Sequence, residues 1–318
     1  MTISVIGCGR WGACIAWYLD SIGNTVTVYG PDDAPQIHEF INTRTNGTVT
    51  FPDSITLTTS LEEAIRSDIL VVSIPSQNLR SLMEELVPLA PVGKTFILCM
   101  KGIEIASGKR LSQIVSEYHS KNNAVAVWIG PGHPQEFVNG IPNCMVIDSD
   151  NEAVKTELVQ AFSSPLIRFY YGADLIGNEI GAALKNVIGI AAGMLDGYGV
   201  SSLKGALMSR ATSEVARFIF AMGGDGRSAY GLCHLGDYEA TVFSKYSHNR
   251  AFGEAYIKGE PFEALAEGYY TADAVHRMAQ KARVDMPICE AVYAILYENK
   301  EPREVLTSLF HRTIKKEF

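Results

Sequence analysis

Long apolar runs, paired cysteines and excess positive charge are the features that this sequence lacks. The longest apolar run, at 187–195, has nine residues, whereas a membrane-spanning helix needs about 20. We therefore expect no stable membrane insertion. The first residues contain no basic segment followed by an apolar stretch, so we also expect no signal peptide.

The cysteines are few and scattered. None of the six stands in a C-x-x-C pair, which is the spacing typical of structural metal sites and redox motifs. Most lie in apolar segments, as small buried hydrophobic residues do. We therefore expect a reduced, cytoplasmic protein without a bound metal. A lone catalytic cysteine is the alternative.

Positive charge is outnumbered by negative charge. The chain has 27 Lys and Arg against 35 Asp and Glu, which gives a net charge of −8. Nucleic-acid binding needs clustered Lys and Arg, so we expect no nucleic-acid partner. A small anionic ligand stays open, because it needs only a local positive pocket.

The sequence has a glycine motif near its N-terminus. A β-rich segment at 2–6 runs into Gly7-Cys8-Gly9-Arg10-Trp11-Gly12, followed by a helical pattern at 13–22 and a second strand at 25–29. G-x-G-x-x-G between a strand and a helix is typical of dinucleotide binding. Its glycines permit a tight turn, the approach of a pyrophosphate and close helix–strand packing. The alternative is a glycine-rich turn without a ligand.

The choice between NAD and NADP depends on the end of the second strand. An acidic residue that bonds the ribose of NAD is expected there, but the chain has Tyr29-Gly30-Pro31-Asp32-Asp33. The two aspartates would repel a 2′-phosphate, and no Arg or Lys follows before Arg44. We expect NAD as the cofactor, with NADP as the alternative.

Strands alternate with helices up to residue 174. We expect helices from 76 to about 90 and at 152–162, and strands at 68–76, 95–100, 124–129, 143–147 and 166–170. This alternation indicates a Rossmann-type, doubly wound and mainly parallel sheet. Ligands bind at the carboxyl ends of such strands, where we expect Ser76, Lys101 and the 130–136 loop. A solvated loop lysine is the alternative for Lys101.

From residue 175 onward the pattern is helical. We expect helices at 175–197, 203–222, 226–232, 249–258, 261–266, 271–283, 288–298 and 302–312. The chain is long enough for two domains of ordinary size. We therefore predict a dinucleotide-binding domain at 1–174 and an all-α substrate domain at 175–318, with the active site in the cleft between them.

Lys185 and Asn186 stand at the head of an apolar stretch that extends to Leu195. A helix that is apolar all round is buried, and an unpaired ammonium is very costly to bury. A lysine held there by partners has a readily shifted pKa and suits proton transfer. The alternative is a lysine that snorkels to solvent at a helix end.

A second polar cluster follows downstream. Asp237 and Thr241 precede Ser247-His248-Asn249-Arg250, which opens a predicted helix. The free N–H groups at a helix N-terminus favour an anion, and Asn249 and Arg250 add donors. A capped surface helix with a solvated arginine is the alternative.

These motifs together give the chain a resemblance to the NAD(P)-dependent glycerol-3-phosphate dehydrogenase family over essentially its whole length. The order of Ala183-Leu184-Lys185-Asn186-Val187, Leu235-Gly236-Asp237 with Thr241, and Asn249-Arg250 is more specific than the glycine motif. Further matches are Pro75-Ser76, Lys101-Gly102, Gly130-Pro131 and Glu267-Gly268.

The resemblance implies an enzyme that reduces dihydroxyacetone phosphate, a triose phosphate, to sn-glycerol 3-phosphate with NAD(P)H and so supplies a phospholipid precursor. It implies that Lys185 is the general acid, with Lys101 and Asp237 as further catalytic residues. The implied substrate-binding residues are Lys101, Gly130, Asn186, Thr241, His248, Asn249 and Arg250. The implied cofactor-binding residues are Gly7, Gly9, Arg10, Trp11, Gly12, Tyr29, Pro75, Ser76, Lys101, Pro134, Arg250 and Glu267. A homodimer is a further family expectation.

Three departures from the family pattern lie at the predicted substrate edge. His248 stands where family members usually carry an arginine that binds the substrate phosphate, and histidine lacks the bidentate fork. The 132–135 loop reads Gly-His-Pro-Gln, and the loop after Gly197 is one residue shorter than usual. Two other functions therefore stay open. One is a related dehydrogenase of another small anionic keto or hydroxy substrate. The other is a non-catalytic dinucleotide sensor, which the presence of Lys185 and Asp237 opposes.

Overall fold

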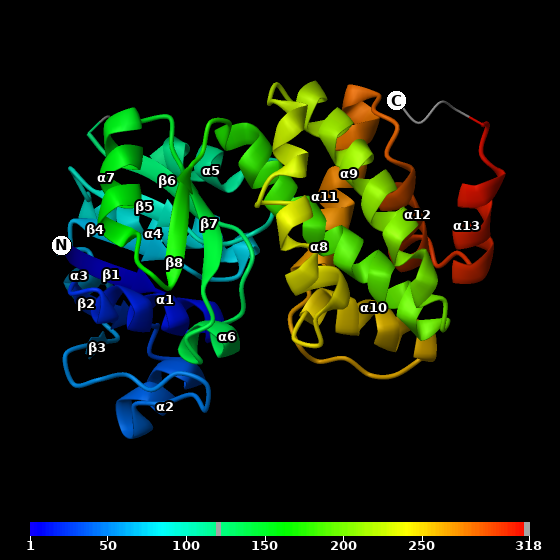
Figure 1. The fold of residues 1–318 in the computed structure, drawn as a ribbon. Coiled ribbons are helices and arrows are strands. Elements are labelled where there is room, and N and C mark those ends of the chain that lie inside the picture. The colour runs from blue at the N-terminus through cyan, green and yellow to red at the C-terminus, as the bar shows by residue number, and fades with distance from the viewer. Residues whose placement is uncertain (119–121, 315–318) are drawn as a thin grey trace.

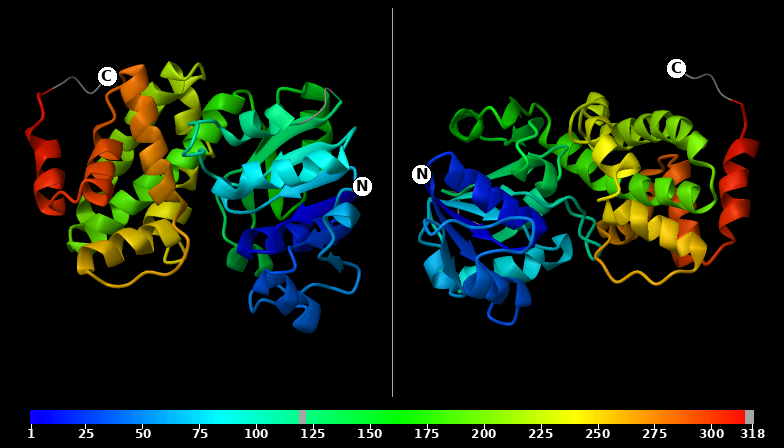
Figure 2. Two further views of the ribbon diagram at one scale, coloured as in Figure 1. Left: turned by 180° about the vertical axis from the view of Figure 1, so that it is seen from behind. Right: turned by 60° about the horizontal axis from the view of Figure 1, so that its bottom comes forward.

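An eight-stranded sheet and a bundle of helices lie side by side in the protein (Figures 1 and 2). The structure, a computed structural model, describes residues 1–118 and 122–314. The strands are β1 Thr2–Ile6, β2 Thr25–Tyr29, β3 Thr56–Thr58, β4 Ile69–Val72, β5 Thr95–Leu98, β6 Ala124–Ile129, β7 Asn143–Asp148 and β8 Ile167–Tyr171.

The strand order β3-β2-β1-β4-β5-β6-β7-β8 has β1 at the point where the chain reverses its direction across the sheet. Every neighbouring pair is parallel except β6 and β7. The predicted doubly wound, mainly parallel sheet is therefore confirmed. In such a sheet the ligand-binding edge lies at the carboxyl ends of β1 and β4.

Helices cover both faces of this sheet. They are α1 Arg10–Ser21, α2 Pro35–Thr43, α3 Leu61–Ala64, α4 Leu79–Leu86, α5 Leu111–Tyr118, α6 Pro134–Val138 and α7 Glu152–Phe162. Residues of α1 and α7 pack on one face, with Trp128 fully buried between them and the strands. Residues of α4 and α5 pack on the other face. The strands are apolar on both sides because both sides are covered.

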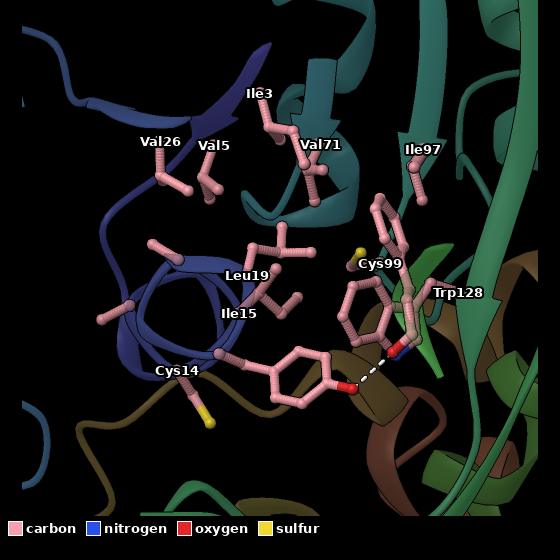
Figure 3. Close-up of a cluster of buried hydrophobic side chains, with 14 of the residues drawn as sticks. Ile3, Val5, Cys14, Ile15, Leu19, Val26, Val71, Ile97, Cys99 and Trp128 are labelled. Carbon is pink, nitrogen blue, oxygen red and sulfur yellow. Dashed lines mark hydrogen bonds between the residues drawn. The ribbon is translucent and has the colours of Figure 1, made fainter. Parts of the chain in front are cut away.

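Figure 3 shows this packing under α1. Ile15 and Leu19 point from one side of the helix toward Val5 and Val71 on the strands, with Trp128 beside them. The spacing of four residues between Ile15 and Leu19 places both on one helix face. The helix that follows the glycine motif is thereby held firmly on the sheet, so its N-terminus has a defined position.

The second half of the chain is helical. Its helices are α8 Leu175–Gly197, α9 Lys204–Ala221, α10 His248–Lys258, α11 Glu267–Ala282, α12 Pro287–Tyr297 and α13 Pro302–Ser308. In Figure 1, α8 runs through the middle of this bundle with α9, α10 and α11 around it. By length and composition α8 could cross a membrane, but 89% of its most apolar window is buried inside the protein. It is the core helix of the bundle.

Three predicted segments differ in the structure. The segment at 261–266 forms no helix, and the one at 226–232 is a short 3-10 turn over Gly226–Tyr230. The predicted strand 68–76 is in the sheet only over Ile69–Val72, and its last predicted residue, Ser76, already begins a 3-10 turn. The prediction did not include α2, α3, α5, α6 or β3. All of these are short, so they carry too few periods of an apolar pattern to stand out.

Glycines let α8 and α10 approach each other closely. A Cβ atom added at Gly193 would lie 1.9 Å from the carbonyl oxygen of Arg250, and one added at Gly253 would lie 2.1 Å from that of Ile190. Real Cβ atoms do not come so near to backbone oxygens. The two helices therefore need hydrogen as the side chain at both positions.

We predict that Gly193→Ala lowers the free energy of unfolding by about 1–3 kcal/mol, because overpacking forces α8 and α10 apart. Urea unfolding followed by circular dichroism measures the change. Gly205→Ala in α9 is the matched control, since a Cβ atom there meets nothing within 4 Å. This control should be neutral or stabilising by up to about 1 kcal/mol. Equal stability of the two variants would contradict the close packing.

Candidate active site

Lys185 lies in the middle of α8 and is buried, with 7% of its surface exposed. Its Nζ atom is 2.6 Å from Oδ2 of Asp237 and donates a hydrogen bond to Oγ1 of Thr241 at 2.8 Å. A lysine at the end of a helix, with its ammonium in solvent, is therefore not what the structure shows. The ammonium is held by partners inside the protein.

Lys101 approaches the same carboxylate from the sheet. It follows β5 by three residues, and its Nζ is 2.7 Å from Oδ2 of Asp237. The same Nζ donates to the carbonyl oxygen of Gly130, at 2.8 Å, beyond the end of β6. Asn186 donates to the carbonyl oxygen of Lys101 at 3.1 Å and so joins α8 to this strand end. One carboxylate oxygen thus lies between ammonium groups from the two halves of the chain.

A buried histidine positions the segment that carries Asp237. The ring of His234 bonds the carbonyl oxygen of Gly181 through Nδ1 at 2.9 Å and the hydroxyl of Tyr238 through Nε2 at 2.7 Å. Nδ1 must donate to the carbonyl oxygen, and in a neutral ring Nε2 then accepts from the hydroxyl. Burial lowers the pKa of His234 to about 4, which agrees with a neutral ring. The sequence contains no spacing that would have revealed this support.

The electrostatics of the site favour proton transfer at Lys185. Burial lowers the pKa of Lys185 to about 7; the negative charge of Asp237 opposes this shift, and the positive charge of Lys101 adds to it. An ammonium with a pKa near neutrality can both release and regain its proton. Within the described part of the chain, Oδ1 of Asp237 is buried without a hydrogen-bond partner.

His133 is a site residue that the sequence did not point to as a ligand. Its ring packs edge-on against Tyr246, with 5.4 Å between ring centres. Among the described residues, its Nε2 atom is buried without a partner. Burial lowers the pKa of His133 to about 4, and the positive charge of Lys185 adds to this shift. A neutral imidazole therefore faces the lysine cluster.

The glycine motif forms a cradle at the carboxyl end of β1. Gly7 has a φ of +109°, and a Cβ atom added to it would lie 2.2 Å from the carbonyl oxygen of Ser73. Gly12 is equally tight, with an added Cβ 2.0 Å from the carbonyl oxygen of Gly7. A Cβ atom added at Gly9 meets nothing within 4 Å, so this side of the loop is open at the N-terminus of α1. These residues fit the pyrophosphate of a dinucleotide.

Glu267 joins the helical half to the end of β4. Its Oε1 accepts from the backbone N–H of Ser76 at 2.9 Å, and its Oε2 accepts from the Ser76 hydroxyl. Burial raises the pKa of Glu267. Pro75, the residue before this contact, directly precedes the 3-10 turn Ser76–Asn78. The predicted cofactor residues of the two halves therefore meet here.

Other predicted cofactor residues surround the cradle. Tyr29 ends β2, and its carbonyl oxygen accepts from the N–H of Gly7 at 2.9 Å. The ring of Trp11 packs against Phe137 of α6, with 6.1 Å between ring centres. Pro134 is the first residue of α6, so it lies on the helix that carries Phe137. The cradle thus has an aromatic wall on one side.

Arg250 lies apart from the lysine cluster. Its Nη1 atom is paired with Asp196 and, at 3.0 Å, with Glu254, and its Nε donates to the carbonyl oxygen of Ser244 at 3.2 Å. Lys204 is also paired with Asp196, at 2.6 Å. The guanidinium thus bonds residues of the helical half, and the predicted contacts of Arg250 with substrate and cofactor stay predictions.

Asn249 and His248 are the other predicted substrate residues in α10. Oδ1 of Asn249 accepts from the N–H of Gly268 at 2.8 Å. His248 contacts Arg10 of the glycine motif across the junction of the two halves, with 2.5 Å between Nε2 and Nη1. The N-terminus of α10 is therefore tied to both α11 and the cofactor cradle.

We predict that Asp237→Asn destabilises the protein by about 3 kcal/mol at pH 6, because it leaves the buried ammonium of Lys185 and the partly buried ammonium of Lys101 without a counter-charge. Without the carboxylate, the pKa of Lys185 in the folded variant falls below its value in the folded wild type. At pH 6 the folded variant therefore binds fewer protons than the folded wild type, whereas at pH 9 Lys185 is neutral in both folded proteins. The loss of stability should therefore shrink as the pH rises to 9. Urea unfolding at both pH values measures it, with Asp53→Asn on the surface as the control. A loss that does not depend on pH would contradict this electrostatic account.

The sequence of this chain is similar to those of known dehydrogenases. Residues 2–155 match the N-terminal model of NAD-dependent glycerol-3-phosphate dehydrogenase, and residues 174–307 match its C-terminal model. Two glycerol-3-phosphate dehydrogenases [NAD(P)+] align over 100% of this chain and 99% of their own length: that of Thermoanaerobacter sp. (strain X514) at 36% identity and that of Thermotoga sp. (strain RQ2) at 37%.

A solved structure agrees with these relatives. The glycerol-3-phosphate dehydrogenase of Coxiella burnetii superposes with a TM-score of 0.92 at 26% identity, covering 98% of this chain and 99% of that one. The predicted fold class and the predicted resemblance are confirmed together. The chain belongs to the NAD-dependent glycerol-3-phosphate dehydrogenase family of oxidoreductases, which use a nicotinamide cofactor.

Proposed function

We propose that this protein is a glycerol-3-phosphate dehydrogenase that reduces dihydroxyacetone phosphate to sn-glycerol 3-phosphate, a phospholipid precursor. The observation that supports this most directly is the pair of ammonium groups on the buried Asp237, placed at the carboxyl edge of the sheet beside the glycine cradle. Both the curated relatives carry the same activity in their names.

The chemical step needs a proton donor at the substrate carbonyl. The nicotinamide cofactor, when bound, supplies the hydride, and negative charge then develops on the carbonyl oxygen. Lys185 is positioned to stabilise this charge and to donate a proton from Nζ. Its pKa of about 7 makes the proton available at neutral pH. Lys101 holds a second positive charge next to the same oxygen of Asp237.

Asp237 and Thr241 orient the donor. Their oxygens lie 2.6 and 2.8 Å from Nζ of Lys185, so two of the three ammonium hydrogens are directed and one is left for the substrate. An amine that loses its proton regains it more easily beside a carboxylate, because the negative charge raises its pKa. The three residues thus act as one proton-transfer unit.

We propose NAD rather than NADP as the preferred cofactor. Asp32 and Asp33 follow the end of β2, where the adenosine ribose of a dinucleotide belongs. Their charges would repel a 2′-phosphate. We also propose that 1–174 forms the dinucleotide-binding domain and 175–318 the substrate domain of a cytoplasmic homodimer.

A second candidate is a related NAD-dependent dehydrogenase of another small anionic keto substrate. His248 favours it, since a neutral imidazole at the predicted phosphate position is weaker than a guanidinium. Oxidation of NADH by the purified protein, with dihydroxyacetone phosphate and with a panel of 2-keto acids, separates the two. Turnover of a 2-keto acid alone would assign the second function.

We predict that Lys185→Ala lowers kcat by about 10²-fold or more, because the step loses its general acid. NADH binding, measured by fluorescence titration, should survive. Lys109→Ala is the matched control, since Lys109 is 44% exposed and paired with Glu117 on the surface. Loss of NADH binding together with turnover would instead make Lys185 a structural residue.

We also predict opposite pH dependences for the two directions of the reaction. Reduction needs the Lys185 ammonium, so its kcat should fall as the pH rises through about 7. Oxidation of glycerol 3-phosphate needs the neutral amine to accept the hydroxyl proton, so its kcat should rise through the same pH. Steady-state rates between pH 5.5 and 9 test this. The same trend in both directions would exclude Lys185 as the titrating group.

A further inference from the structure

Arg10 and His248 form a contact between the two halves of the protein. Arg10 is the first residue of α1, directly after Gly9 of the cofactor cradle, and His248 is the first residue of α10. Nη1 of Arg10 lies 2.5 Å from Nε2 of His248. A guanidinium carries donors only and keeps its charge in proteins, so Nε2 must be the acceptor.

The second nitrogen of the same ring supports this assignment. Nδ1 of His248 lies 3.3 Å from the carbonyl oxygen of Leu265, to which only an N–H can donate. The proton is thus on Nδ1, and the imidazole is neutral. Burial and the charge of Arg10 lower the pKa of His248, which agrees with this state. The positive charge of the Arg10–His248 pair therefore belongs to Arg10.

The Arg10 side chain points toward the substrate side of the active site. A dinucleotide pyrophosphate belongs at the backbone of the glycine loop, whereas the guanidinium reaches the first turn of α10. That turn packs on α8 one turn after Lys185, since a Cβ atom added at Gly189 would lie 3.2 Å from Cβ of Asn249. Arg10, Lys101 and Lys185 all contribute to lowering the pKa of His133. These three positive charges therefore all lie near the ring of His133.

We propose that Arg10 determines substrate specificity by binding the substrate phosphate, with His248 as the neutral residue that positions its guanidinium. This inference rests on the proposed function, because it names the group that receives the phosphate of dihydroxyacetone phosphate. One donor of the guanidinium bonds His248, and the remaining donors form a fork that suits phosphate oxygens.

The first turn of α10 adds to this site. The first N–H groups of a helix have no partner within the helix, and Ser247 caps α10 by accepting from the N–H of Arg250 at 3.3 Å. The earlier N–H groups of the turn lie beside His248 and favour an anion. In this chain the positive charge that binds the phosphate thus belongs to Arg10 of the sheet half, and His248 of the helical half positions it.

The first test is Arg10→Ala. We expect its KM for dihydroxyacetone phosphate to rise about tenfold or more, the cost of losing charge-assisted hydrogen bonds. The resemblance implies that Arg10 binds the cofactor, and we assign this contact to its backbone, because its side chain contacts His248. The dissociation constant of NADH, measured by fluorescence, should therefore stay within about twofold. Arg227→Ala is the matched control, since Arg227 is 89% exposed and pairs locally with Asp225. An unchanged KM, or an equal loss of NADH affinity, would overturn the inference.

Variants at His248 test the positioning role. His248→Gln keeps an acceptor for Arg10 and should keep the KM within about threefold of the wild type, whereas His248→Ala should raise it. In the double variant Arg10→Ala with His248→Arg, the guanidinium is moved to the other side of the same contact. This variant should recover most of the affinity lost in Arg10→Ala. No recovery would assign the loss to a distorted glycine loop and would overturn the inference.

Inorganic phosphate separates this inference from the proposed function. We expect phosphate to compete with dihydroxyacetone phosphate, with an inhibition constant about tenfold higher in Arg10→Ala than in the wild type. If the wild-type protein does not turn over dihydroxyacetone phosphate, the proposed function fails. Phosphate binding to the NADH complex, followed by ³¹P NMR, then tests Arg10 alone. Equal phosphate affinity of the wild type and Arg10→Ala would overturn the role of Arg10 in either case.

Discussion

The buried carboxylate of Asp237 is the interaction on which the structure of this active site depends. Its Oδ2 atom bonds Lys185 at 2.6 Å and Lys101 at 2.7 Å. Loss of the carboxylate of Asp237 would leave the ammonium groups without a counter-charge, and loss of the lysines would leave the carboxylate buried and unpaired. Because Lys101 follows a strand and Lys185 belongs to α8, this one carboxylate also fixes how the sheet half meets the helical half. The same carboxylate therefore sets both the positions of the two lysines and the contact between the two halves of the chain.

Several other contacts across the same junction support this arrangement. Glu267 binds the backbone and hydroxyl of Ser76, and Asn186 binds the carbonyl oxygen of Lys101. Arg10 reaches His248 from the glycine loop. Each contact joins a residue at the carboxyl edge of the sheet to a residue of α8, α10 or α11. Contacts within the protein thus hold the cofactor cradle and Lys185 at a defined distance, which favours catalysis by orientation.

The small residues of α8 make this junction compact. Gly193 lies against the backbone of α10, and Gly189 lies beside Asn249. Side chains at these positions would push α10 away from α8, and His248 would move with it. His248 and Asn249 keep their positions because α8 has glycine, with no side chain, where it contacts α10. In the apolar stretch of the sequence, the glycines are therefore as necessary as the lysine.

Much of the architecture could be predicted from the sequence, because it depends on local patterns. The glycine motif at 7–12 and the apolar strands predicted the sheet, and the range of α8 was predicted residue for residue at 175–197. Lys101, Lys185, Asp237 and Thr241 were singled out by their motifs, and the structure brings them together. The predicted helix at 261–266 is wrong, and the unpredicted α2, α5 and α6 have only nine, eight and five residues. Their conformation is decided by what they pack against.

By itself, the amino-acid sequence determined the class of fold and the glycine cradle, and it singled out the residues that we propose for proton transfer, since each lies in a local motif or at a strand end. Only the tertiary structure decided how charge is distributed among them. It showed that burial lowers the pKa of Lys185 to about 7 and keeps His133 and His234 neutral, and that the guanidinium of Arg10 contacts His248. The physical reason is that protonation depends on burial and on charges from distant parts of the chain. Arg10 and His248 are separated by 238 positions in the sequence, so no local pattern reveals their contact.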